Sequence, residues 1–270
     1  MSADTRTVLI TGASTGIGRA TALHLAAAGW DVHAGMRTPE PLGDRITPVR
    51  LDLTNDDHIE QLKDLPQLDA VVNNAGIFVG GPIEALDLDE LRHQLEVNVV
   101  GQVAVTQAVL PKLRARRGRV VFISSANGRV SAPLTGAYGA SKFALEAIAD
   151  AMRIELRPWR IGVSLIEPGV IDTDMWRNSD TTVKETIAAL SPAHRTLYAR
   201  HITGLTKAMA RLRRTTQPVS IVAQAVERAL TDRNPKARYA VGNDARTQEV
   251  LRAILPTRAM DALLARVFGI

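Results

Sequence analysis

Short runs of β-branched and apolar residues alternate with longer helical patterns along most of the chain. The runs span residues 7–11, 31–36, 47–53, 68–76, 119–125 and 161–169, with a final one at 238–242. Between them lie helical stretches such as residues 17–29, where Ala20, Leu23 and Ala27 share a face and Gly29 suits the helix end. Strands that are apolar almost throughout are typical of parallel sheets covered on both faces. The alternation therefore predicts an α/β fold with a doubly wound parallel sheet.

The domain organisation follows from the same pattern. A length of 270 residues suits a single α/β domain, and no repeat, low-complexity tract or linker interrupts it. We expect one domain over residues 1–270, with an irregular, basic substrate loop or lid at 175–218 and a C-terminal extension at 219–270. Residues 88–113 are expected to form one long, largely buried helix.

Composition excludes several classes of protein. The chain is 46% hydrophobic and 23% charged, which argues against disorder, and it has no cysteine for disulfides or thiolate metal sites. The first ten residues lack the features of a signal peptide, and no apolar run approaches the roughly 18 residues that span a bilayer. We therefore expect a soluble, cytoplasmic protein. The six histidines show no metal-ligand spacing, so no metal is expected, and His24 and His93 are interpreted as structural.

Glycines follow the first predicted strand at the point where a helix begins. Gly12, Gly16 and Gly18 stand in the sequence "TGASTGIG", a GxxxGxG spacing that differs from the general GxGxxG dinucleotide fingerprint. Glycines let the backbone approach phosphates closely, and the helix N-terminus offers N–H groups and the positive end of its dipole. The loop therefore predicts a site for the pyrophosphate of a dinucleotide.

A tyrosine and a lysine stand four residues apart in "YGASK", so Tyr138 and Lys142 share one face of a helix. A phenol ionises near pH 10, and a nearby ammonium together with a cationic nicotinamide ring would lower its pKa. We therefore expect Tyr138 to exchange a proton with an alcohol or carbonyl oxygen. Ser125, at the end of a predicted strand, is placed to hydrogen-bond the same oxygen. Taken singly, a core tyrosine and a turn serine would be the simpler interpretations.

These motifs together resemble the short-chain dehydrogenase/reductase family of the classical type. "TGASTGIG", "NNAG" at 73–76, Asn98, the serines at 124–125, "YGASK" and "PGVIDT" at 168–173 occur in the family's order and spacing, over residues 5–175. The resemblance implies a Rossmann-like fold and an NAD(P)-dependent alcohol/carbonyl oxidoreductase. It assigns catalysis to Asn98, Ser125, Tyr138 and Lys142. Asn98 would support a water that connects Lys142 to solvent, and Lys142 would also hold the nicotinamide ribose.

The resemblance also implies a set of cofactor contacts. Asn74 would both brace the strand edge and contact the cofactor, Asp52 would accept from the adenine amino group, and Thr173 would lie on the phosphates. For Asp52, capping of the next helix is an alternative role. The residues expected to bind the cofactor are Thr11, Gly12, Ser14, Thr15, Gly16, Ile17, Gly18, Arg37, Asp52, Leu53, Asn74, Ala75, Gly76, Tyr138, Lys142, Pro168, Gly169, Val170, Ile171 and Thr173.

The residue after the second strand bears on cofactor choice. Members that prefer NAD carry an acidic residue there, whereas this chain has Met36 followed by Arg37. An arginine suits a 2′-phosphate, and no carboxylate is present to repel it. We therefore expect NADP, with NAD as the alternative.

Two further stretches, "SKFALEAIADAMRIEL" and "VSLIEPGVIDT", resemble the branch that contains 17β-hydroxysteroid and retinol dehydrogenases. The resemblance implies a lipophilic, steroid- or retinoid-like substrate, either a secondary alcohol and ketone or a primary alcohol and aldehyde. It also implies a homodimer or homotetramer. The alternative function is that of a non-catalytic dinucleotide-binding sensor or regulatory protein.

Positive charge is concentrated near the C-terminus. From residue 191 onward there are 14 Lys and Arg against 5 Asp and Glu, a balance of +9 in a chain of net charge +5. Few aromatic residues accompany these charges, so no nucleic acid is expected. Within 191–218, an apolar helical stripe runs through Tyr198, Ile202, Leu205, Met209 and Leu212. Three interpretations stay open: a helix packed on its own domain, a mobile lid that closes with Met175 and Trp176 over a lipophilic substrate, and peripheral membrane contact.

Overall fold

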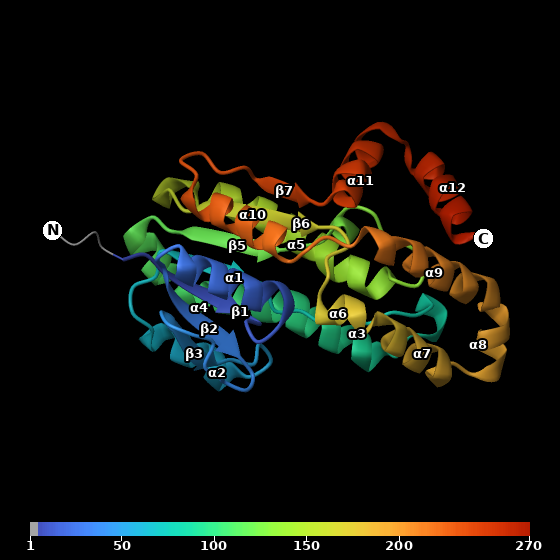
Figure 1. The fold of residues 1–270 in the computed structure, drawn as a ribbon, viewed down its shortest axis with the longest axis horizontal. Coiled ribbons are helices and arrows are strands. Elements are labelled where there is room, and N and C mark those ends of the chain that lie inside the picture. The colour runs from blue at the N-terminus through green and yellow to red at the C-terminus, as the bar shows by residue number, and fades with distance from the viewer. Residues whose placement is uncertain (1–4) are drawn as a thin grey trace.

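The computed structural model describes residues 5–270, without the side chains at positions 179, 180 and 182. Its core is one parallel sheet. Within these residues seven strands follow the order β3-β2-β1-β4-β5-β6-β7, and every neighbouring pair is parallel. The expected doubly wound sheet is confirmed (Figure 1). The strands are β1 (Thr7–Thr11), β2 (Asp31–Met36), β3 (Ile46–Arg50), β4 (Ala70–Asn73), β5 (Arg119–Ile123), β6 (Gly162–Pro168) and β7 (Arg238–Val241).

Helices cover both faces because both faces of the strands are apolar. In β1, Val8 and Ile10 are buried in one hydrophobic cluster, whereas Leu9, between them, is buried in the other. The first cluster lies under α1 (Gly16–Ala27) and α10 (Ser220–Thr231), and the second under α4 (Gly101–Arg116) and α5 (Gly136–Glu155), on the opposite face (Figure 1). This burial of alternate residues on two faces explains why the strands read as continuous apolar runs.

The strand order places a crevice at the carboxyl ends of β1 and β4. The chain runs outward from β1 to β2 and β3 and then returns to pair β4 with the other side of β1. At such a reversal the connections diverge and leave a binding crevice beyond the strand ends. The glycine loop follows β1, and "NNAG" begins at the end of β4.

The helix expected at residues 88–113 has a different character in its two halves. It consists of α3 (Leu88–Leu95), a π-helical turn (Glu96–Val100) and α4. Seven residues of α4 are buried, but Gln94 is the only buried residue of α3. The expectation of one largely buried helix is therefore wrong for α3, which lies beyond the carboxyl ends of the strands and packs against α5 (Figure 1).

The segment expected to be irregular is helical. It contains α6 (Asp174–Arg177), α7 (Ser179–Ala189), α8 (Pro192–Leu197) and α9 (Ala199–Leu212). Local signals explain two of the starts, since Thr173 caps α6, and Ser191 caps α8 with Pro192 at its first position. Together with α11 (Asn243–Ile254) and α12 (Thr257–Phe268), these helices gather at the carboxyl end of the sheet (Figure 1). The remaining helix, α2 (Asp56–Glu60), is short.

Among residues 5–270, no helix combines the length and the apolar character needed to cross a membrane. The expectation about a leader sequence also involves residues 1–4, which lie outside the described residues.

Candidate active site

The glycine loop forms a cradle in which Gly12 and Gly18 have no room for a side chain. Gly12 has a φ of 64°, and a Cβ there would lie 2.8 Å from the Cα of Ala75. A Cβ on Gly18 would collide with the carbonyl of Gly12 and the amide of Asn74. Thr15 occupies the N-cap of α1 without a side-chain cap, and the first turn of α1 carries no acidic residue. This uncapped, carboxylate-free helix start fits the phosphates of a dinucleotide.

Asn74 ties the ends of β1 and β4 together beneath this cradle. Its Nδ2 donates to the carbonyl oxygens of Thr11 (2.9 Å) and Gly12 (3.0 Å). The Oγ1 of Thr11 in turn accepts from the backbone N–H groups of Asn74 and Ala75. These bonds hold the glycine loop against "NNAG".

Arg37 and Asp52 lie at the end of the crevice beyond β2 and β3. The carboxylate of Asp52 accepts hydrogen bonds from the backbone N–H (3.0 Å) and Oγ1 (2.7 Å) of Thr54. These bonds, with a smaller contribution from the charge of Arg37, lower the pKa of Asp52. Asn55, not Asp52, caps α2, so the alternative role of Asp52 as a helix cap is wrong.

Tyr138 and Lys142 lie one turn apart on α5, facing the end of β5. The Nζ of Lys142 is 5.6 Å from the centroid of the Tyr138 ring and donates to the carbonyl of Ile123 at 2.8 Å. Ser125 starts the short turn that follows β5, and its side chain hydrogen-bonds with Tyr138. The last residues of one strand and the first turns of one helix thus bring a hydroxyl, a phenol and an ammonium together.

The pKa values in this cluster are dominated by burial. Burial raises the pKa of Tyr138, and the hydrogen bond with Ser125 opposes this effect. Burial also lowers the pKa of Lys142 to about 8, against the opposing influence of Glu146. Among the groups of the protein, burial therefore decides the direction of the Tyr138 pKa, and the combined effect of Lys142 and a cationic nicotinamide ring on this pKa stays a prediction.

Asn98 lies within the π-helical turn and is fully buried. Its Oδ1 accepts from the N–H of Ile77 (2.8 Å), and its Nδ2 donates to the carbonyl of Ile77 (2.9 Å) and to Ser141 (3.0 Å). A Cβ on Gly76 would lie 3.2 Å from Asn98 Oδ1 and 3.9 Å from Lys142 Nζ, so these three residues meet behind the cluster. π-Helical turns are frequent at functional sites.

The loop Pro168–Thr173 is held by a residue that the sequence analysis missed. The carboxylate of Asp244, in the first turn of α11, accepts from the N–H of Val170 at 2.7 Å. It fills the space that a side chain on Gly169 would need. The methyl and Cβ of Thr173 lie 3.5 Å from a Cβ position on Gly16, so this loop closes over the glycine cradle. The sequence signal that could have identified Asp244 is its place directly after "YAVGN", because acidic residues are favoured at helix starts.

A single cavity of about 900 Å³ joins these elements. Of the predicted site residues, all but Thr11, Gly18 and Asn98 line it, and these three are buried beneath it. The rest of its wall is mainly apolar. Part of it comes from the expected substrate loop or lid at 175–218, and part from segments that were not assigned to the site, including Phe78, Leu134, Leu251, Leu264 and Phe268. His93, interpreted from the sequence as structural, also lines the cavity.

Comparison with known proteins agrees with this geometry. The short chain dehydrogenase family matches residues 6–184. Retinol dehydrogenase 5 of Mus musculus is 34% identical over 95% of this chain and 87% of its own length, which agrees with the expected branch. The uncharacterized oxidoreductase YbbO of Escherichia coli K12 is 35% identical, covering 96% and 94%.

Solved structures match over nearly the whole chain as well. A short-chain dehydrogenase from Streptomyces avermitilis has a TM-score of 0.77 at 29% identity, covering 99% of this chain and 96% of that one. One from Burkholderia cenocepacia J2315, in complex with NADP, has a TM-score of 0.75 at 26% identity, covering 97% of each. With the glycine cradle, the Ser–Tyr–Lys cluster and these matches, the chain belongs to the short chain dehydrogenase family and is an NAD(P)-dependent oxidoreductase.

Proposed function

We propose that this protein interconverts a lipophilic alcohol and the corresponding ketone or aldehyde with NADP as its cofactor. The observation that carries the proposal is the single cavity in which the glycine cradle, Ser125, Tyr138 and Lys142 face a largely apolar wall. A dinucleotide along the cradle would leave the apolar part for a substrate.

Arg37 supports the choice of NADP. It lines the cavity directly after β2, where Met36 stands in place of the carboxylate that would accept from ribose hydroxyls. A guanidinium there pairs well with a 2′-phosphate. The Burkholderia cenocepacia neighbour contains NADP, whereas a 3-ketoacyl-(acyl-carrier-protein) reductase from Brucella melitensis, 20% identical, is complexed with NADH. NAD is therefore the alternative for this chain.

The side chains of the cluster have complementary tasks in this proposal. The nicotinamide ring, when bound, supplies or accepts the hydride. Ser125 and Tyr138 hold the substrate oxygen between two hydroxyl groups, where negative charge develops during reduction. The phenol of Tyr138 carries its proton near neutral pH, since its ordinary pKa is 10.0 and burial raises it further, and it donates this proton to the oxygen as negative charge develops there. Lys142, fixed to Ile123, would hold the ribose, and Asn98 would support the water behind Lys142.

The helices of 175–218 form one side of the substrate space in this proposal. Ile202, Leu205, Met209 and Leu212 of the apolar stripe line the cavity, together with Met175 and Trp176. The first residue of the stripe, Tyr198, donates through its hydroxyl to Glu84 at 2.7 Å. Because the apolar stripe lines the cavity, it supports a lid that opens for a lipophilic substrate more than a helix packed into a core.

The sensor alternative has less support, because the chain keeps the hydroxyl, phenol and ammonium groups in contact around the cavity. A homodimer or homotetramer also remains our expectation.

Turnover is tested by following the absorbance of the reduced nicotinamide with a panel of apolar ketones, aldehydes and alcohols. Tyr138→Phe should lower kcat by about a hundredfold to ten-thousandfold, the usual contribution of a positioned acid, while the affinity for the dinucleotide stays unchanged. Dinucleotide binding without turnover of any compound by the wild type would favour the sensor.

A further inference from the structure

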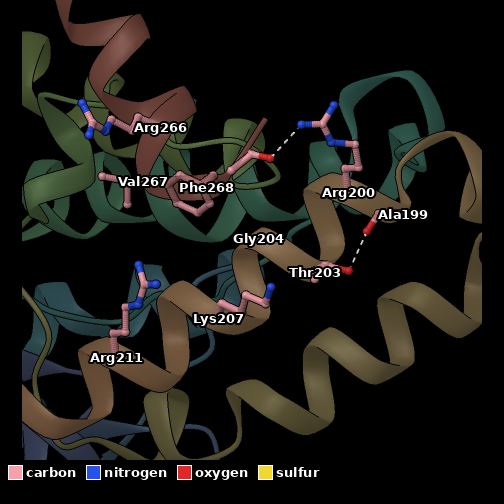
Figure 2. A pocket seen from close by; sticks show the side chains of 10 residues that line it. Ala199, Arg200, Thr203, Gly204, Lys207, Arg211, Arg266, Val267 and Phe268 are labelled. Carbon is pink, nitrogen blue, oxygen red and sulfur yellow. Dashed lines mark hydrogen bonds between the residues drawn. The ribbon is translucent and has the colours of Figure 1, made fainter.

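A second concave site lies between α9 and the end of α12. It has a volume of about 430 Å³ and is lined by four cationic residues: Arg200, Lys207 and Arg211 from α9, and Arg266 from α12. Figure 2 shows these side chains around the place where Phe268 lies over Gly204. The other residues that line it are small or apolar, and none is acidic. We name these four cations and the hollow between them the basic groove.

The cations of α9 are grouped by the helix period. Arg200, Lys207 and Arg211 are seven and four residues apart, so they lie along one face over about 16 Å of helix. All three are exposed. The helices touch beneath them, because a Cβ on Gly204 would collide with the carbonyl of Phe268. Arg200 also donates to the carbonyl of Gly269 at 3.2 Å, which fixes the end of α12 beside α9.

Within the described residues, Lys207, Arg211 and Arg266 form no salt bridge with a carboxylate. Lys207 and Arg211 lie one turn apart on α9 and repel each other, and an anion bound between α9 and α12 removes this repulsion.

The basic groove is continuous with the catalytic cavity. Arg211, Val267 and Phe268 line both spaces, so the two meet at the C-terminal end of α9. The cavity wall is mainly apolar, whereas the groove is cationic. A molecule that fills the cavity and emerges at this junction therefore places its outer end among Lys207, Arg211 and Arg266.

We propose that the basic groove binds an anionic group at the end of the substrate remote from the reacting carbon, so that the substrate class is an apolar molecule with a carboxylate, phosphate or sulfonate head. This inference rests on the proposed function, because it takes the apolar part of the cavity to be the substrate site. The anion belongs to the substrate itself in this assignment and not to a membrane surface.

The test compares fatty acids that carry a methyl ketone at the end remote from the carboxylate with their methyl esters, over increasing chain lengths. We expect kcat/KM with NADPH to favour the acid by about tenfold at the length that spans cavity and groove, which corresponds to about 1.4 kcal/mol. Added salt should reduce this preference, because the groove is exposed.

The variant Lys207→Gln/Arg266→Gln should raise KM for the acid about tenfold and leave kcat and the ester unchanged. Arg252→Gln/Arg258→Gln is the matched control, since it removes the same charge from exposed positions of α11 and α12 outside the groove and should change neither substrate. An acid preference that is absent at every chain length, or that survives in the groove variant, would overturn the inference while turnover of the esters still supports the proposed function.

Two further measurements separate the remaining outcomes. Calorimetric binding of lauric acid and methyl laurate in the presence of NADPH does not depend on turnover. If no ketone is reduced, the proposed function fails. The groove assignment then stands only if lauric acid binds more tightly than methyl laurate and the groove variant removes this difference in affinity; otherwise it fails as well. The vesicle measurement tests whether the protein pellets with phosphatidylglycerol vesicles but not with phosphatidylcholine vesicles. If the groove variant loses this pelleting while it keeps the acid preference, the groove belongs to a lipid surface and our inference is overturned.

Discussion

The carboxyl group of Glu167 lies in a partly buried ion cluster directly before the loop Pro168–Thr173. Its side chain is 3% exposed, and its Oε1 accepts from Arg129 Nε at 3.1 Å and lies 3.3 Å from Arg238 Nε. Arg238 Nε also donates to Glu146 at 3.0 Å, so two carboxylates share one guanidinium. Burial first, and the charge of Glu146 second, raise the pKa of Glu167 from 4.5 to about 7.

The raised pKa makes stability depend on pH with a defined sign. Between pH 4.5 and about 7 the folded protein keeps a proton on Glu167 that the unfolded chain has lost, so the free energy of unfolding falls as pH rises through this window. The difference between the two pKa values corresponds to about 3 kcal/mol, most of it between about pH 5 and pH 8. Above about pH 8 this group contributes no further change.

Glu167→Gln removes the ionisation and keeps an amide oxygen that accepts the bond from Arg129. The difference in the free energy of unfolding between the variant and the wild type should therefore grow in favour of the variant by about 2–3 kcal/mol as the pH rises from about 5 to about 8. Urea unfolding followed by tryptophan fluorescence at several pH values measures this difference. Comparing the two proteins removes the contributions of other groups to the pH dependence of stability. One such group is His33: burial lowers its pKa, so its contribution has the opposite sign.

Asp150→Asn is the matched control from the same cluster. The hydrogen bond from Arg238 lowers the pKa of Asp150, so its contribution is present above the ordinary pKa of an aspartate and is lost only at lower pH. This variant should be less stable by a constant amount over the same range. Parallel pH profiles for the wild type and Glu167→Gln would refute the electrostatic reasoning.

Three other predictions concern the cofactor, the loop and the lid. Arg37→Ala should raise KM for NADPH about tenfold to a hundredfold and leave KM for NADH unchanged, and equal effects on both would contradict the role of Arg37. Asp244→Ala, which removes the acceptor for the N–H of Val170, should raise KM for NADPH about tenfold, whereas Asp244→Asn should retain most of the affinity. If Asp244→Ala behaves as the wild type in steady-state kinetics, the loop is not held by this carboxylate. Leu205→Ser should raise KM for an apolar substrate while the KM for the cofactor and the melting temperature change little, and a lower melting temperature with an unchanged KM would show a core helix.

The sequence by itself determined the features that depend on local periods. The strand–helix alternation predicted a parallel sheet because both faces of each strand are apolar, as in β1 with Val8, Leu9 and Ile10. The glycine cradle follows from where the first strand ends and the first helix begins. The spacing of Tyr138 and Lys142 places them on one helical face without reference to the rest of the chain.

Only the tertiary structure decided what surrounds these groups. Asp244 meets Gly169 and Val170 from a helix more than 70 residues away, which no local pattern reveals. The C-terminal helices become walls of the catalytic cavity and the basic groove for the same reason. The direction in which the pKa of Tyr138 is shifted could be found only from the folded chain, because desolvation depends on every residue packed around the phenol. The sequence spacing to Lys142 identifies only one of these neighbours.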